Sequence, residues 1–203
     1  MIMSITMRIA TWDDAEQVLE IYAPFCVATP VSFETEAPSV DEIKRRIATA
    51  LEFFPWLIAE EGGRVLGYAY GSRHRERAAY RWSADVSVYV REDTRGKGVG
   101  RALYTSLFAI LKLQGIQNIV AGITSPNPAS VALHEAMGLR PIGVYKSIGY
   151  KCGVWHDVGW WQLALPARGG EPLEPLSFPS IRNGIECADA IRGGLGYIKR
   201  KYS

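Results

Sequence analysis

A glycine-rich loop with two cationic side chains offers the clearest chemistry in this sequence. Glycines let a backbone approach a ligand closely, and the free N–H groups at a helix start point towards anions. The six residues lie between a predicted strand and an amphipathic helix pattern, and they are Arg95, Gly96, Lys97, Gly98, Val99 and Gly100. They suit a pyrophosphate, although a plain glycine turn that caps a helix explains the hexapeptide equally well.

Two common phosphate-binding motifs do not describe this loop. The pattern GxxxxGK[ST] is absent, and the third glycine comes one residue too early for GxGxxG. The loop therefore indicates neither a P-loop nucleotidase nor a Rossmann dinucleotide site.

The elements around the loop predict a mixed sheet of the α/β (α+β) class. Apolar residues recur at helical spacing after the loop, which predicts a helix over about 98–114. Other helices are expected over about 11–22, 39–53 and 127–138, and strands over about 5–10, 56–60, 65–70, 82–90, 118–124, 139–149 and 154–165. Three strands in a row precede the helix at 98–114, which argues against a doubly wound fold.

Length and composition are those of one globular domain with an extension. The chain has 203 residues, of which 48% are hydrophobic and 22% are charged. We interpret residues 1–165 as the domain. Residues 166–203 hold four Pro and six Gly, so we expect a poorly ordered tail with a short helix near 186–192. A partner-binding tail is the alternative, because Lys199, Arg200 and Lys201 cluster near its end.

Charge and cysteine content argue against several classes of function. The net charge is only +2, so binding to nucleic acid or a membrane surface would need a local patch. No apolar run approaches the ~18–20 residues of a membrane span, and the first residues lack a signal-peptide pattern. Three widely spaced cysteines form neither a disulfide framework nor a metal knuckle. We therefore expect a cytoplasmic protein without metal, nucleic-acid or membrane partners.

In its context the loop resembles that of the GNAT superfamily of N-acetyltransferases, whose R/Q-x-x-G-x-G/A loop holds the pyrophosphate of acetyl-CoA. Longer segments look like the phosphinothricin and methionine sulfoximine N-acetyltransferases. These segments are PWLIAE at 55–60, SVYV at 87–90, LHEA at 133–136 and a block over 149–159. The resemblance covers about residues 7–165. It implies the GNAT fold, a mixed and mostly antiparallel sheet that is flanked by helices and partly split after the fourth strand.

The resemblance implies acetyl-CoA as the cosubstrate and assigns residues to it. The strand residues Val88, Tyr89 and Val90 would pair with the pantetheine arm through their backbone. Asn127 would contact the cofactor, with Ser130 nearby. Asn127 is also a plain helix cap, and the two roles are compatible.

Acetylation of an amine needs a base, a contact for the developing oxyanion and a proton for the leaving thiolate. Asp85 is the candidate base. The relatives carry Glu in the matching segment, so the shorter Asp85 side chain would act through a water, and a solvated or ion-paired Asp is the alternative. His134 lies about two helical turns after Asn127 and is the candidate proton donor or relay, with a structural role as the alternative. For His156 we prefer a structural role.

Residues 73–81 hold four arginines, which form either a solvated loop or a clamp for an anionic substrate. By resemblance, Arg75, Arg77 and Tyr80 belong to the substrate loop. Phe33 matches another family segment and would wall the pocket, unless it is a plain core aromatic.

Together these features predict an N-acetyltransferase that moves acetyl from acetyl-CoA to the amine of a small anionic amino acid or analogue. The phosphinothricin or methionine sulfoximine type is the substrate that the resemblance implies, with direct transfer in a ternary complex. The rival is a CoA-binding sensor or scaffold with little activity, suggested by Asp85 at the position of the base. No cysteine has a convincing base partner, so none is expected to be a nucleophile. A homodimer is expected by resemblance alone.

Overall fold

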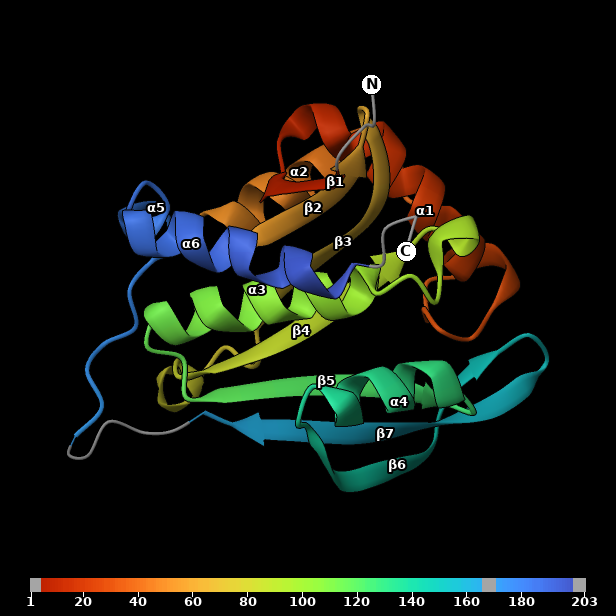
Figure 1. The fold of residues 1–203 in the computed structure, drawn as a ribbon. Coiled ribbons are helices and arrows are strands. Elements are labelled where there is room, and N and C mark those ends of the chain that lie inside the picture. The colour runs from red at the N-terminus through yellow and green to blue at the C-terminus, as the bar shows by residue number, and fades with distance from the viewer. Residues whose placement is uncertain (1–4, 166–170, 199–203) are drawn as a thin grey trace.

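The computed structural model describes residues 5–165 and 171–198. These residues form one seven-stranded mixed sheet with helices packed on it (Figure 1). The strand order is β1-β2-β3-β4-β5-β7-β6. The strands are β1 (Ile5–Ile9), β2 (Trp56–Glu61), β3 (Arg64–Arg73), β4 (Ser83–Val90), β5 (Asn118–Ser125), β6 (Arg140–Lys151) and β7 (Val154–Ala164). All neighbours are antiparallel except β4 and β5. The predicted mixed, mostly antiparallel sheet is confirmed.

Helices cover both faces of the sheet because its inner strands are apolar on both sides. Along β2, Trp56 and Ile58 pack against one group of helices, while Leu57 and Ala59 pack on the opposite face. The first face carries α1 (Ala15–Ala28) and α2 (Val40–Leu51), and the second carries α3 (Val99–Leu113). Over β5 lies α4 (Pro128–Ala136) (Figure 1). Within the described residues, no helix is long and apolar enough to cross a membrane.

The fourth and fifth strands run together only briefly. Their parallel pairing extends from Ser83–Asn118 to Asp85–Val120 and then stops. Beyond this point β4 continues beside β3, and β5 continues beside β7. The two strands therefore diverge, and one edge of residues 86–90 has no strand partner among the described residues. The predicted split after the fourth strand is confirmed.

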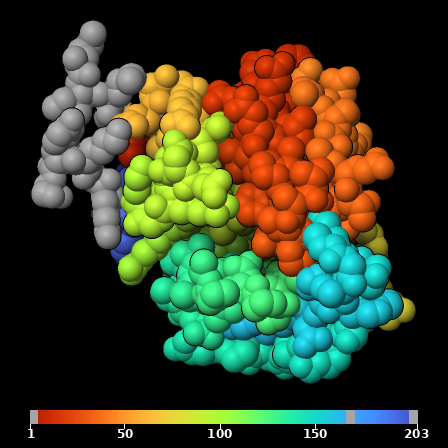
Figure 2. Space-filling model, turned by 90° about the vertical axis from the view of Figure 1, so that its right-hand side faces the viewer, coloured from red at the N-terminus to blue at the C-terminus, as the bar shows by residue number. Residues whose placement is uncertain are grey.

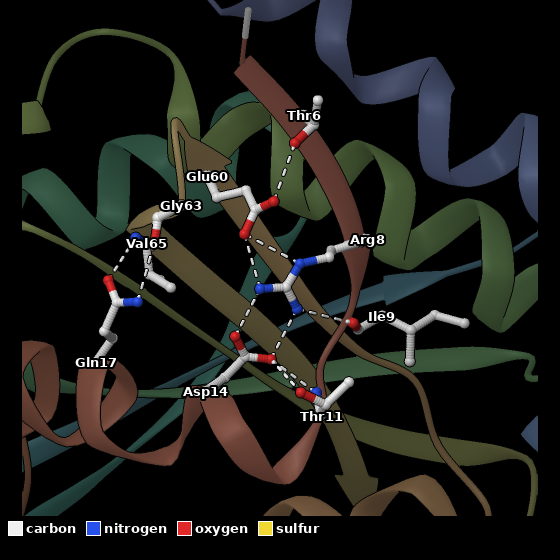
Figure 3. Close-up of polar contacts among 9 residues, drawn as sticks. All are labelled: Thr6, Arg8, Ile9, Thr11, Asp14, Gln17, Glu60, Gly63 and Val65. Carbon is white, nitrogen blue, oxygen red and sulfur yellow. Dashed lines mark hydrogen bonds and ion pairs between the residues drawn. The ribbon is translucent and has the colours of Figure 1, made fainter. Parts of the chain in front are cut away.

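A polar network fixes the start of α1 against the sheet (Figure 3). The Arg8 guanidinium donates to both carboxylate oxygens of Asp14, at 2.6 and 2.7 Å, and to Glu60 at 2.7 and 3.0 Å. Burial alone would raise the pKa of Asp14, but the hydrogen bonds from Arg8 and Thr11 lower it below its ordinary value. On α1, the Gln17 amide donates to the Gly63 carbonyl in the turn between β2 and β3 and accepts from the Val65 N–H at the start of β3. These contacts set the position of α1.

The C-terminal extension belongs to the core, so the expectation of a poorly ordered tail is wrong for residues 171–198. Helix α5 (Phe178–Ile181), helix α6 (Ile185–Gly193) and the turn Gly194–Tyr197 follow one another, with α6 and the turn alongside α3 (Figure 1). Their apolar side chains pack into the hydrophobic cluster that α3 also belongs to. The high Pro and Gly content of the segment hid this apolar face in the sequence. These side chains are Phe178, Ile181, Cys187, Ile191, Leu195 and Ile198. The short helix expected near 186–192 is confirmed, and Lys199, Arg200 and Lys201 lie outside the described residues.

Replacing Phe178 by Ala should destabilise the protein by about 3–5 kcal/mol, because its ring is 0% exposed and the site cannot collapse fully. For a chain of this size that corresponds to about 6–20 °C in Tm. The control is Leu173→Ala at an 82% exposed position, which should change stability by less than about 0.5 kcal/mol. Equal melting temperatures in the two variants would show that the extension does not stabilise the domain.

Candidate active site

Asp85 and His74 form a hydrogen-bonded pair where β4 leaves β5. Asp85 is the last β4 residue paired with β5, and His74 directly follows β3. His74 Nδ1 lies 2.6 Å from Asp85 Oδ1. The side chains are 17% and 29% exposed, so both are partly shielded from solvent. Burial raises the pKa of the Asp85 carboxyl above its ordinary value, although the hydrogen bond to His74 acts in the opposite direction.

A cavity of about 330 Å³ opens beside this pair. This volume is large enough for a small molecule, since ligand pockets usually measure ~300–1,000 Å³. Side chains from the segment after β3 form one wall, and side chains from β5, β6 and β7 form the others. The aromatic and larger polar side chains among them include His74, Arg75, Tyr80, Tyr145, Trp160 and Gln162. The cavity is lined by aromatic rings and a few polar groups, as small-molecule sites usually are.

Two aromatic rings hold His74 in the cavity wall. The Tyr80 ring meets it edge to face at 5.7 Å between centroids, and the Trp160 ring does so at 6.3 Å. In the sequence, His74 is one residue of the arginine-rich segment 73–81 and has no motif of its own. Its signal was the pairing register: Ser72 lies opposite Asp85, so continuing the register by two residues places His74 diagonally across from Asp85 on the same face.

The structure brings together some of the predicted substrate residues and separates others. Arg75 and Tyr80, which the resemblance assigned to the substrate loop, line the cavity. Arg77 is the exposed N-cap of the turn Ala78–Tyr80 and does not line it. Phe33 also lies outside this lining, because its ring packs against Gly149, where an added Cβ would lie 2.2 Å from it. At 41% exposure, Phe33 is not a plain core residue either.

Buried Lys151 fixes the loop that carries Phe33. Its ammonium donates to the backbone carbonyls of Ser32 and Glu34, each at 2.6 Å. His156 Nε2 in turn donates to the Lys151 carbonyl at 2.9 Å. The connection between α1 and α2 is therefore tied to the β6–β7 hairpin, and His156 has the structural position that we expected.

The glycine-rich loop has the geometry of an anion cradle. Gly96 and Gly98 adopt φ of 75° and 85°, a left-handed conformation that glycine tolerates best. Gly98 is the N-cap of α3, so the first N–H groups of this helix have no partner within it. The guanidinium of Arg95 lies over the Phe25 ring at 5.5 Å, and the Lys97 ammonium donates to the Asp93 carbonyl at 2.7 Å. The residues present therefore fit the pyrophosphate of a nucleotide cofactor.

The diverging strands open towards this loop. Tyr89 packs on the α1 side with Tyr22 and Phe25, whereas Val88 and Val90 pack on the α3 side. The backbone edge of this part of β4 is thus left for a ligand. Figure 2 shows this end of the molecule, which has a recess across it. The yellow-green loop and red α1 lie above the recess, and teal α4 and the cyan end of the β6–β7 hairpin lie below it.

His134 on α4 is 4% exposed and has both ring nitrogens hydrogen bonded. Its Nδ1–H donates to the Ser130 carbonyl at 2.8 Å, which leaves Nε2 to accept from the Tyr104 hydroxyl at 2.9 Å. Burial lowers the pKa of His134 and raises that of Tyr104, which favours the neutral form of both groups. Asn127 Oδ1 accepts from the Ser130 N–H, which makes Asn127 the helix cap that the sequence offered as one interpretation.

The described residues contain no group of three or more His, Cys, Asp or Glu side chains that could hold a metal. The three cysteines are free, with Cys26 and Cys187 buried and Cys152 exposed. Burial raises the pKa of both buried thiols, which keeps them protonated.

Comparison with known proteins gives consistent matches. Residues 7–160 match the family described as acetyltransferase (GNAT) domain. The chain is 37% identical over 175 residues to a phosphinothricin N-acetyltransferase of Streptomyces viridochromogenes, covering 85% of this chain and 95% of that one. It is 36% identical over 174 residues to an L-methionine sulfoximine/L-methionine sulfone acetyltransferase of Pseudomonas paraeruginosa, covering 84% and 100%.

A solved structure shares both fold and sequence with the chain. It is a GNAT superfamily phosphinothricin acetyltransferase from Sinorhizobium meliloti in complex with acetyl-CoA. The TM-score is 0.80 at 34% identity, with 88% of this chain and 98% of that chain covered. The chain therefore belongs to the GNAT N-acetyltransferases, within the family of phosphinothricin and methionine sulfoximine N-acetyltransferases.

Proposed function

We propose that this enzyme transfers the acetyl group of acetyl-CoA directly to the amine of a small anionic amino acid or amino-acid analogue. The observation that carries the proposal is the His74–Asp85 pair at a cavity of about 330 Å³, beside the point where β4 leaves β5. Relatives named for phosphinothricin and for methionine sulfoximine support this class of substrate.

The groove between the diverging strands is the proposed site of acetyl-CoA, which supplies a thioester carbonyl as the electrophile. Arg95 and Lys97 add positive charge where the first N–H groups of α3 meet the pyrophosphate. The backbone edge of Val88 to Val90 runs along the pantetheine arm, in the manner of an added strand. Asn127 and Ser130 begin the helix on the other side of the groove.

The cavity is the proposed site of the acceptor. The Arg75 guanidinium provides paired donors for a carboxylate or phosphinate, and Tyr80 adds an aromatic wall. Cationic acceptors such as polyamines are disfavoured because Arg75 repels them. Arg77 and Phe33 lie outside the lining of this cavity, so neither is a proposed contact of the acceptor.

The acceptor amine must lose a proton before it attacks the thioester carbonyl. The negative charge of Asp85 favours the transfer of this proton to the His74–Asp85 pair. Backbone N–H groups on the free edge of residues 86–88 are the proposed contact for the developing oxyanion. For His134 the geometry supports the structural interpretation, because a neutral imidazole with both nitrogens occupied has no proton to give to the thiolate.

CoA release should occur with phosphinothricin, methionine sulfoximine or another anionic amino acid, and not with polyamines or a lysine peptide. Arg75→Gln should raise KM for such an acceptor about 10–150-fold, because a hydrogen bond to a charged group contributes ~1.5–3 kcal/mol. Arg192→Gln on α6 is the control and should leave KM unchanged. Release with polyamines or the peptide alone would contradict the acceptor site. A rise in Tm with acetyl-CoA but no transfer to any amine would favour a CoA-binding sensor.

His134→Ala should destabilise the protein by about 1–3 kcal/mol, because the buried Tyr104 hydroxyl loses its acceptor. Tyr104→Phe removes the same hydrogen bond while keeping the imidazole, so kcat should be similar in the two variants once both are folded. A fall of kcat by ~10²-fold or more in His134→Ala alone, at a temperature where it is folded, would instead make His134 the proton donor.

A homodimer stays a prediction. The β6–β7 hairpin exposes several large apolar side chains, and contiguous exposed apolar surface often marks a protein–protein interface. These side chains are Ile142, Val144, Tyr145, Ile148, Tyr150, Val154 and Trp155. Sedimentation velocity should give twice the 22.5 kDa chain mass, and Val144→Lys should shift it to the monomer. A monomeric parent protein would contradict the prediction.

A further inference from the structure

We propose that His74 is the general base of this enzyme and that Asp85 is its positioning partner, so that the two work as a dyad. The inference rests on the proposed function, because it assigns the proton acceptor for the same reaction. It assigns to His74 the step that the sequence had given to Asp85 acting through a water.

The hydrogen bond between the two side chains decides which nitrogen is free. An ionised carboxylate can only accept, so the 2.6 Å contact places the hydrogen on His74 Nδ1. The neutral ring then carries its lone pair on Nε2, at the opposite side of the imidazole. Asp85 thereby fixes both the tautomer and the direction of the basic nitrogen.

Access to the cavity separates the two members of the pair. His74 lines the cavity, together with Arg75 and Tyr80, whereas Asp85 does not. An acceptor anchored by its anionic group on Arg75 meets the imidazole before it can reach the carboxylate. The edge-to-face contacts with Tyr80 and Trp160 keep the ring in this orientation. The geometry therefore gives the imidazole, and not the carboxylate, to the substrate.

The low exposure of Asp85 suits a carboxylate that stabilises a neighbouring cation. When His74 takes a proton, the dyad holds an imidazolium beside a carboxylate, joined by a short charge-assisted hydrogen bond. Burial raises the pKa of Asp85, whereas His74 and Arg75 act in the opposite direction by favouring the charged carboxylate. The remaining charged or titratable groups that face the pair are Arg75, Tyr70, Tyr80 and Tyr145.

The proton balance of the reaction needs such a group. His74 Nε2 accepts one proton from the substrate ammonium, which frees the nitrogen lone pair. The nitrogen lone pair forms the C–N bond to the acetyl carbon. The C–S bond breaks, and the electron pair of that bond leaves with the sulfur. The nitrogen then loses a second proton as the amide forms. One of the two protons ends on the sulfur and the other passes through His74 to solvent.

The test is His74→Asn, because the Asn side-chain amide keeps a donor for Asp85 but offers no basic nitrogen. With the acceptor identified by CoA release, kcat should fall about 10²–10⁴-fold, while Tm and acetyl-CoA binding stay unchanged. Glu76→Gln, an exposed change in the same segment, is the matched control and should keep full activity. Free imidazole should restore part of the activity of His74→Ala.

The pH profile gives a readout that a packing role would not move. Because the base must be unprotonated, kcat/KM rises with pH on the acid side. This limb should be lost or displaced in His74→Asn, because the group whose protonation sets it is no longer present. Activity of His74→Asn within about threefold of the parent, with an unchanged acid limb, would overturn the dyad and return the base to Asp85. A parent protein that acetylates no amine would instead refute the proposed function.

Discussion

The short parallel pairing of β4 with β5 is the constraint on which the rest of the site depends. Only three residue pairs join these strands, and the last is Asp85–Val120. If the pairing continued, the edge of residues 86–90 would be used in the sheet and would not be available to a ligand. If it ended earlier, β5 and β7 would no longer be held at a fixed distance from β4, and the cavity walls that they form would not be held in place. Asp85 stands where the two regions meet.

Helix α3 packs against β4 where β4 diverges from β5, and the C-terminal extension packs against α3. Gly194 packs against the Ala102 carbonyl so closely that an added Cβ would lie 2.1 Å from it. The chain then passes the glycine-rich loop, where the Tyr197 carbonyl would lie 2.0 Å from a Cβ on Gly98. The Arg101 guanidinium lies over the Tyr197 ring at 4.4 Å. Gly98 therefore meets two constraints, a left-handed φ and a close neighbour.

The sequence predicted most of the frame because local patterns determine it. Apolar spacing predicted a helix over about 98–114, and the structure has it at Val99–Leu113. The succession of strands and helices along the chain was predicted from the same kind of local pattern. His74 was missed because its role depends on the register of β3 against β4, which no single strand encodes. The extension was misjudged because composition averages over its few apolar anchors, Phe178 above all.

The two histidines of the site show why residue type alone could not assign the chemistry. His134 sits in a helix that the resemblance marked as functional, yet both of its nitrogens are hydrogen bonded and burial keeps it neutral. His74 lies in a segment that read as an arginine-rich loop, yet one nitrogen is anchored on a carboxylate and its ring lines the cavity. A base needs a lone pair that faces substrate and a partner that stabilises the cation it becomes. Of these two imidazoles, only His74 has both.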